Sequence, residues 1–144
     1  MKVLIAEDSV FVVDRLRGIV GALDLVEIVG LARDGEEALQ LYRSRAPDVV
    51  VLDLQMPKRD GLDVLTEIRT ENRACIIIVL TNHNLPEFRT ACLQAGADFF
   101  LGKSAEFDRL PGILSELAHR LETGALRPLA GPMTPQPITH DDRF

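Results

Sequence analysis

Four strand-like apolar runs in this chain are followed by residues whose side chains bind metal ions or phosphoryl groups. Glu7 and Asp8 follow VLIA, Asp53 follows VVVL, Thr81 follows IIIVL and Lys103 follows FFLG. In an open sheet of parallel strands, the residues at the carboxyl ends of the strands gather around one crevice. Three carboxylates, a hydroxyl and an ammonium in one crevice predict a site that binds a divalent cation and transfers a phosphoryl group.

The acidic residues determine which chemistry is expected. Two carboxylates about 4 Å apart repel each other by roughly 1 to 4 kcal/mol, so a group of three needs a cation. Hard oxygen ligands favour Mg²⁺, with Mn²⁺ as the closest substitute. A carboxylate can also act as a nucleophile and form an acyl phosphate. We assign that role to Asp53 because it ends the central strand, and we expect Thr81 and Lys103 to stabilise the phosphoryl charge.

Each of these residues also has an ordinary structural interpretation. An acidic pair such as Glu7 and Asp8 after a strand is, on its own, more often a solvated turn or a helix cap. A threonine at a strand end is usually structural, and a single lysine is usually a surface charge. The coincidence of suitable residue types at the ends of four strands favours the joint functional interpretation.

The elements that must position these residues alternate between strand and helix. Such an alternation predicts βα units and an α/β fold with a doubly wound parallel sheet. Three runs are apolar throughout, as expected for strands covered on both faces, whereas LVEIVGLA contains Glu27 and Gly30 and predicts an edge strand. The predicted strands begin near Lys2, Val26, Val49, Ile76 and Phe99.

Several residues indicate where helices begin. Asp34 and Glu37 have the spacing of a capping box, and Pro86 suits the first turn of the fourth helix. Pro111 would remove a hydrogen bond from a helix interior but is tolerated in a first turn. We therefore expect the last helix to begin close to Asp108.

Length and charge restrict the class of protein. The chain has 144 residues, a formal net charge of -6 and a pI near 5.0. We expect one domain over residues 1–122, because this length is enough for one good core. Residues 123–144 contain four prolines and do not continue the helical apolar period, which predicts a flexible tail. The absence of a Lys/Arg stripe argues against nucleic-acid binding.

The cysteines and the N-terminal residues indicate the cellular compartment in which the protein is expected. Cys75 lies in an apolar run, and Cys92 lies in a predicted helix that would bury it together with Phe88, one turn away. Without a CxxC pair, both are expected to be reduced structural thiols. The start MKVLIAED is too short for a signal-peptide core or a membrane span. We therefore predict a cytoplasmic protein without a membrane partner.

The strings VLIAEDS, DVVVLDLQMPKRDGLDVLTEIR, IIIVLTN and GADFFLGKS resemble the receiver domain of two-component response regulators. The resemblance covers Met1 to about Leu121. It implies a flavodoxin-like (βα)5 sandwich with strand order 2-1-3-4-5, in agreement with the predicted edge strand. It further implies that Asp53 accepts phosphate from a histidine kinase or a histidine phosphotransfer protein.

The resemblance also implies roles for other residues. Glu7, Asp8, Asp53 and the backbone carbonyl of Gln55 would hold Mg²⁺, and Thr81 and Lys103 would contact the phosphoryl group. Phe100 matches the aromatic position that takes part, with Thr81, in the conformational switch, and we expect it to turn inward after phosphorylation.

The sequence departs from the family pattern at a few positions. Ser104 stands where proline usually follows the lysine, which removes an expected cis X-Pro bond. Phe100 lacks the hydroxyl of the commoner tyrosine, and Asn82 replaces a smaller residue. We expect Gln55 and His83 to border the phosphoryl group and to influence how fast water removes it, although His83 is equally readable as an exposed loop residue.

The predicted function is that of a stand-alone response regulator that signals through a protein-binding face changed by phosphorylation. It would be a phosphoacceptor with Mg²⁺-dependent self-phosphorylation and self-dephosphorylation rather than an enzyme acting on other molecules. The tail is too short for an output domain, so the effector would be a separate protein. The face that includes the last two helices is a candidate dimer interface.

Alternatives remain open at the level of sequence. The chain could be a relay that passes phosphate to a second histidine, or the receiver part of a truncated DNA-binding regulator. A phosphohydrolase with an aspartyl nucleophile is disfavoured. The chain would then resemble sequences with a second acid two residues after the nucleophile, and Gln55 occupies that position. A flavodoxin-like electron carrier is disfavoured because Glu7 and Asp8 would repel a flavin phosphate.

Overall fold

The computed structural model describes residues 1–83 and 85–124 and contains a five-stranded parallel sheet. The strand order is β2-β1-β3-β4-β5, as predicted, with β2 at one edge. Four of the five strands begin at the predicted residue, and β2 begins one residue later. The strands are β1 Lys2–Ala6, β2 Glu27–Ala32, β3 Val49–Leu52, β4 Ile76–Thr81 and β5 Phe99–Gly102.

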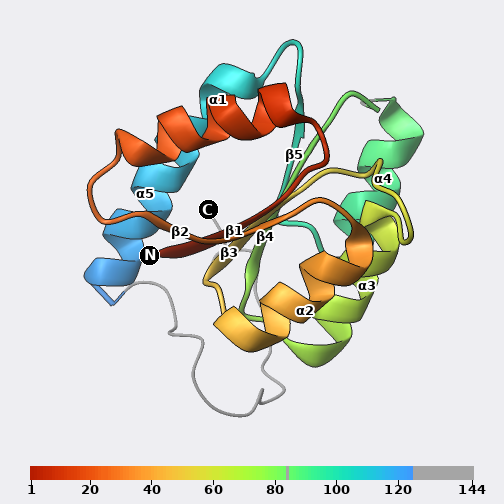
Figure 1. Cartoon of the computed structure of the whole chain (residues 1–144), viewed down its shortest axis with the longest axis horizontal. Helices are drawn as coiled ribbons and strands as arrows, with labels where there is room; N and C mark the ends of the chain where they lie inside the picture. The colour runs from red at the N-terminus through yellow and green to blue at the C-terminus, as the bar shows by residue number, and fades with distance from the viewer. Residues whose placement is uncertain (84, 125–144) are drawn as a thin grey trace.

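Helices cover both faces of the sheet (Figure 1). α1 and α5 lie on one face, and α2, α3 and α4 lie on the other. This arrangement is the doubly wound sandwich that the alternating pattern predicts. The helices are α1 Val10–Gly21, α2 Gly35–Arg45, α3 Gly61–Glu71, α4 Pro86–Gln94 and α5 Leu110–Glu122, with a short 3-10 turn η1 over Phe107–Arg109.

Alternation along the strands divides the core into two clusters. Leu4 of β1 and Val50 of β3 pack under α2 and α3, together with side chains such as Leu65 and Ile68. The neighbouring residues Val3, Ile5 and Val51 point to the other face and pack with α1 and α5. Because successive side chains of a strand point to opposite faces, the runs without polar residues supply both clusters at once.

The edge strand β2 is irregular. Its pairing with β1 skips Val29, since Val3 pairs with Ile28 and Leu4 with Gly30. The Arg45 side chain donates a hydrogen bond of 2.8 Å to the carbonyl of Val29. A bulge and a long charged side chain are two of the devices by which proteins block further strand pairing at an edge.

The helix starts follow their sequence signals. Asp34 caps α2, and its carboxylate accepts a hydrogen bond of 2.8 Å from the Glu37 backbone N–H. Pro86 is the first residue of α4, as predicted. The last helix, α5, begins at Leu110, two residues after the predicted position, and the 3-10 turn η1 precedes it. The predicted tail lies almost wholly in residues 125–144, outside the described residues.

The prediction for α4 is only half right. Cys92 is buried, but the Phe88 side chain is 39% exposed and packs edge-on against the His83 ring, with 5.5 Å between ring centroids. A short helix of nine residues buries a narrow stripe, so one apolar residue per turn reaches the core and the next remains at the surface.

Candidate functional site at the carboxyl rim of the sheet

The predicted site residues come together at the carboxyl ends of β1, β3, β4 and β5. Glu7 and Asp53 directly follow β1 and β3, Thr81 ends β4, and Lys103 directly follows β5. Glu7, Asp53 and Thr81 are buried, whereas Asp8 is exposed. The parallel topology therefore produces the gathering of side chains that the sequence predicts.

Backbone contacts fix the position of Asp53. Its N–H donates a hydrogen bond of 3.0 Å to the carbonyl of Ala6, and the Gly61 N–H donates one of 2.9 Å to the carbonyl of Leu54. A Cβ atom on Gly61 would lie 2.1 Å from the carbonyl oxygen of Asp53, which is far inside van der Waals contact. Only glycine permits this close approach, so α3 begins directly against the backbone of Asp53.

Lys103 joins the two buried carboxylates. Its Nζ lies 2.5 Å from Glu7 Oε1 and 2.9 Å from Asp53 Oδ2. The second oxygen of Glu7 accepts a hydrogen bond of 2.9 Å from the Ser9 N–H, and Asp53 Oδ1 accepts one of 3.3 Å from the Gln55 N–H. The direct contact between Lys103 and Glu7 is a feature that the sequence interpretation did not include.

Burial and charge perturb both members of the Lys103–Glu7 pair. Burial raises the pKa of Glu7 above its ordinary value, and the hydrogen bonds from Lys103 and Ser9 only partly offset this effect. Burial alone would lower the pKa of Lys103, but the hydrogen bonds and charges of Glu7 and Asp53 outweigh it, so the pKa is raised. The ammonium therefore remains charged, and the site holds protons more tightly than isolated groups would.

The three carboxylates form a cluster suited to a hard cation. Glu7, Asp8 and Asp53 each present one oxygen, and these oxygens all lie within 4.8 Å of one another. Only one ammonium offsets their charge within the described part of the chain. Oxygen donors at such spacing, with room for water on the exposed side of Asp8, fit Mg²⁺ or Mn²⁺.

Comparison with known proteins decides the family. Residues 3–115 match the response regulator receiver domain. The chain belongs to this receiver domain family. Its fold and its acidic cluster are those of a two-component receiver, a class of domain in which an acidic pocket binds Mg²⁺.

Individual relatives differ in what accompanies the receiver. The chain is 39% identical over 104 residues to a putative transcriptional regulator from Pseudomonas aeruginosa, covering 69% of this chain and 50% of the relative. It is 34% identical over 140 residues to protein-glutamate methylesterase/protein-glutamine glutaminase 5 from Myxococcus xanthus, covering 95% of this chain and 40% of the relative. The chain thus spans half or less of the length of these two curated relatives.

A solved structure agrees with the fold. The CheX-CheY-BeF3-Mg²⁺ complex from Borrelia burgdorferi contains a chain that matches with a TM-score of 0.75 and 30% identity, covering 81% of this chain and 88% of that chain. No helix among residues 1–83 and 85–124 has the length and apolar character needed to cross a membrane.

The remaining predicted residues lie around the rim of this receiver. The Thr81 hydroxyl oxygen accepts a hydrogen bond of 3.1 Å from the His83 N–H. His83 is half-buried against Phe88, and Gln55 is exposed in the loop that follows Asp53. The loop after β4 thus fixes the Thr81 hydroxyl oxygen through the His83 N–H.

Phe100 occupies the core in this structure. Its ring is 3% exposed and packs with the cluster under α3 and α4, and the Arg89 guanidinium lies 5.8 Å from the ring centroid. Arg89 also donates a hydrogen bond of 3.2 Å to the carbonyl of Phe100. The ring is therefore already turned inward.

The loop after Lys103 closes without the proline that receivers usually carry. Gly102 and Glu106 form two reciprocal hydrogen bonds, one from the Gly102 N–H to Glu106 Oε1 at 3.1 Å and one from the Glu106 N–H to the Gly102 carbonyl at 2.9 Å. The described residues contain no cis peptide bond. The side chain of Glu106 shapes this turn, and a serine takes the place of proline at position 104.

Proposed function

We propose that this receiver accepts a phosphoryl group on Asp53 from a histidine kinase or a histidine phosphotransfer protein. The observation that carries the proposal is the uneven charge at the carboxyl rim, where three carboxylates meet one ammonium. Ion pairs that only stabilise a fold have their charges matched, whereas a surplus of one sign in a crevice favours a ligand of the other sign.

In the proposed reaction, a carboxylate oxygen of Asp53 attacks the phosphorus of a phosphohistidine. The new O–P bond forms as the P–N bond breaks, and the electron pair of the broken bond returns to the imidazole, which takes up a proton. Lys103, 2.9 Å from Asp53 Oδ2, stabilises the charge on the phosphoryl oxygens. The Thr81 hydroxyl donates a hydrogen bond to one of them.

We assign the metal site to Glu7, Asp8, Asp53 and the backbone carbonyl of Gln55. A bound Mg²⁺ or Mn²⁺ ion would offset the charge that accumulates between the carboxylates and the phosphoryl group. Asp8 is the most accessible ligand, because it is exposed while Glu7 and Asp53 are buried and already paired with Lys103.

We assign control of phosphate loss to Gln55 and His83. Gln55 lies two residues after Asp53 and His83 two residues after Thr81, so both follow residues at the carboxyl rim. His83 is held in place by its backbone bond to Thr81 and by its ring contact with Phe88. These contacts support a fixed position for the imidazole next to the phosphoryl group.

We propose that the signal leaves through the face formed by α4, β5 and α5, to a separate effector protein or to a second copy. Exposed apolar side chains on and next to α4 support this assignment, since Leu85 is 53%, Phe88 39% and Leu93 42% exposed. Thr81 ends β4, and a loop of four residues leads from it to α4, so a hydroxyl drawn toward the phosphoryl group also draws this loop. Phosphorylation would then favour the inward packing of Phe100 that the structure already has.

Acetyl phosphate and Mg²⁺ provide the test of the phosphoacceptor. The wild-type chain is expected to gain the mass of one phosphate, and Asp53→Asn is expected to gain none. Asp63→Asn changes an exposed aspartate at the start of α3 and is expected to behave as wild type. Equal labelling of Asp53→Asn and wild type would exclude Asp53 as the acceptor.

A phosphohistidine donor tests the partner. A phosphorylated histidine phosphotransfer domain, incubated with the chain and Mg²⁺, is expected to lose label to wild type and to retain it with Asp53→Asn. Label that stays on the donor in both cases would leave acetyl phosphate chemistry intact and contradict the proposed donor class.

A further inference from the structure

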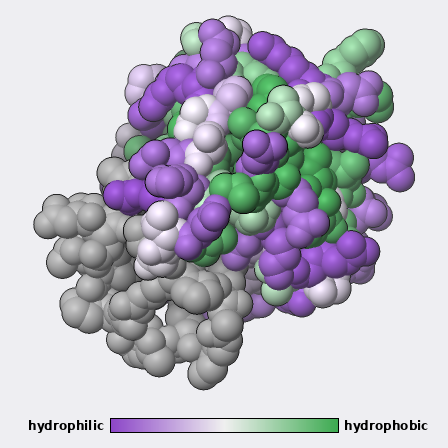
Figure 2. Space-filling view, turned by 90° about the vertical axis from the view of Figure 1, so that its left-hand side faces the viewer, coloured by the Kyte–Doolittle hydropathy of each residue, from purple (hydrophilic) through white to green (hydrophobic). Residues whose placement is uncertain are grey.

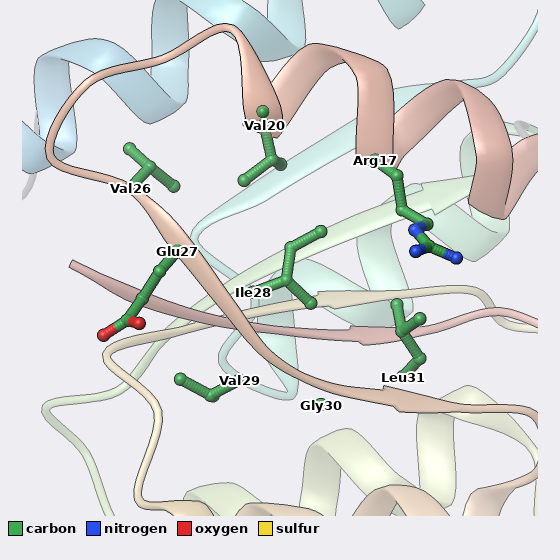
Figure 3. Close-up of a pocket in the computed structure, with 9 residues that line it drawn as sticks. Arg17, Val20, Val26, Glu27, Ile28, Val29, Gly30 and Leu31 are labelled. Atoms are coloured by element: carbon green, nitrogen blue, oxygen red, sulfur yellow. The ribbon is translucent and has the colours of Figure 1, made fainter.

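A groove of about 530 Å³ lies between α1 and β2, on the side of the molecule opposite α4. Val20 descends from α1, and Ile28 and Leu31 rise from β2 toward it (Figure 3). Val26 lies at the end of the groove where β2 begins. Viewed from the left of Figure 1, apolar side chains gather in a band with polar side chains around it (Figure 2).

Two charged residues stand at the groove without partners among residues 1–83 and 85–124. Arg17 lies over the Leu31 end, and Glu27 lies at the Val26 end. The side chain of neither takes part in a hydrogen bond or an ion pair within that part of the chain. The groove is therefore apolar along its length with an unpaired cation at one end, while the Glu27 side chain points from β2 away from Val20 (Figure 3).

The edge of β2 does not favour an added strand. The bulge at Val29 interrupts the backbone register, and Arg45 occupies the Val29 carbonyl. A segment that binds here must therefore do so through side chains placed in the groove, without backbone hydrogen bonds to β2. The polyproline II conformation meets this requirement, because its backbone makes no internal hydrogen bonds and remains solvated.

The sequence after α5 has the matching pattern. In polyproline II, with three residues per turn, residues three apart share one face. Counting in threes from Leu126 gives an unbroken apolar series that ends in an acid: Leu126, Leu129, Pro132, Pro135, Ile138 and Asp141. These residues lie outside the described part of the chain, so the pattern is a property of the sequence alone.

We propose that the segment Pro135–Asp141 docks in the groove between α1 and β2 of the same molecule, with Pro135 and Ile138 against the apolar floor and Asp141 beside Arg17. The dimensions agree, since the six steps from Pro135 to Asp141 span about 19 Å in polyproline II and the five steps from Val26 to Leu31 span about 17 Å in a strand. The charge of Asp141 matches the unpaired Arg17.

The chain can reach the groove from the end of α5. Figure 1 draws the C-terminal end of α5 on the same left-hand side as the start of β2. The ten residues between Gly124 and Pro135 span about 30 Å in polyproline II, against a radius of gyration of about 13 Å for a domain of this size. A tethered segment also acts at an effective concentration in the millimolar range, so a weak site with a Kd of about 1 mM is about half filled.

A nitroxide on the tail of the full 144-residue chain tests the docking. The two cysteines of the sequence, Cys75 and Cys92, are buried, so the label is expected to attach to the new thiol of Thr139→Cys. Wild type treated with the same reagent is the labelling control. Amide signals of Val26–Leu31 are expected to lose at least about half of their intensity, as half occupancy implies, while those of α4 are unchanged.

Two pairs of variants make the result specific. Gly21 lines the groove, Gly18 does not, and a side chain at either meets nothing within 4 Å. In the nitroxide-labelled chain, Gly21→Gln is expected to restore the groove signals, while Gly18→Gln leaves them reduced. In the tail, Ile138→Asp is expected to restore them and Met133→Asp, outside the docked segment, to leave them reduced.

Each alternative outcome overturns the proposal. Absence of signal loss at Val26–Leu31, or equal loss at α4, would show that the segment has no preference for the groove. Signal loss that appears only when isotope-labelled chain is mixed with nitroxide-labelled chain would assign the groove to a second copy. Signal loss that survives both Gly21→Gln and Ile138→Asp would place the contact elsewhere.

Discussion

The two rims of the sheet each contain a buried ion pair, but only one of them is balanced. At the amino ends of β4 and β5, Arg69 pairs with Asp98 at 2.7 Å, and the guanidinium also donates to the carbonyls of Gly96, Asn72 and Cys75. At the carboxyl ends, Lys103 faces three clustered carboxylates.

The difference separates structural from functional use of charge. Asp98 and several carbonyls surround Arg69, and the same Asp98 oxygen also accepts a hydrogen bond of 2.9 Å from the Ile77 N–H. Backbone groups enclose that pair, and Arg69 matches Asp98 charge for charge. Lys103 cannot offset Glu7, Asp8 and Asp53 together, so the opposite rim keeps affinity for a further cation. A buried pair indicates a binding site only when its charges remain unequal.

The largest expected effect is on the balanced rim. Arg69→Met removes the guanidinium beside the buried carboxylate of Asp98, and we expect a loss of about 3 to 5 kcal/mol in the free energy of unfolding. Lys103→Met is expected to cost less when Mg²⁺ is present, because the ion replaces the lost charge. Urea unfolding with and without Mg²⁺ measures both, with exposed Arg33→Met as the control. Equal Mg²⁺ responses of the two variants would contradict the comparison.

The backbone that supports the unbalanced rim is expected to be intolerant of a single methyl group. Gly61→Ala places a Cβ atom against the Asp53 carbonyl, and we expect a loss of about 1 to 3 kcal/mol from the resulting overpacking. Gly112→Ala in α5 meets no neighbour within 4 Å and is expected to gain about 0.5 to 1 kcal/mol. The unfolding temperatures of Gly61→Ala and Gly112→Ala test this. Equal shifts of the two temperatures would show that the loop between Asp53 and Gly61 moves to accommodate the methyl group.

Repulsion within the carboxylate cluster gives a smaller effect of opposite sign. Asp8→Asn removes one of three like charges, so we expect stability without Mg²⁺ to rise by about 1 kcal/mol, the size of a solvent-exposed interaction at 4 Å. The stabilisation by added Mg²⁺ should fall, because the ion loses a ligand. Asp14→Asn on the exposed side of α1 is the control. If Asp8→Asn is less stable than wild type without Mg²⁺, repulsion among the three carboxylates does not destabilise the folded chain.

The thiol of Cys75 reports how tightly the balanced rim is closed. Burial raises its pKa from 9.0 to about 12, so its contribution to stability is complete below pH 9 and is lost as the pH rises toward 12. At pH 9 we expect iodoacetamide to leave native Cys75 unmodified and to modify it in urea. Arg69→Met should speed native modification of Cys75 more than that of Cys92. Rapid modification of the native wild type would show that the rim is open.

Much of the fold could be predicted because the strands are apolar throughout. VVVL and IIIVL can only be strands covered on both faces, and Glu27 with Gly30 identifies the edge. The bulge at Val29 was not predicted, since it depends on how β2 aligns with β1 and not on a residue type. Nor was the exposure of Phe88, because periodicity gives the apolar face of a short helix without saying how far the core extends along it.

The site was predicted as a set of residue types, and its contacts were not. Parallel topology brings Glu7, Asp53 and Lys103 to one rim whatever their rotamers, so their meeting follows from strand order. The Lys103–Glu7 contact depends on side-chain length and burial, and the Glu106 turn depends on a side-chain-to-backbone bond across four residues. The Arg69–Asp98 pair joins residues far apart in sequence, and although both stand in strings that resemble receiver domains, neither string indicates that the two side chains meet.

The two core clusters share no side chain, because alternate residues of each strand serve opposite faces. The sheet thus works as a partition between two separately packed compartments. Substitutions drawn one from each compartment, such as Leu16→Ala in α1 and Leu65→Ala in α3, should add in their effects on unfolding within about 0.5 kcal/mol, as distant sites do. The side chains under α1 and α5 can therefore be repacked while those under α2, α3 and α4 keep their own arrangement.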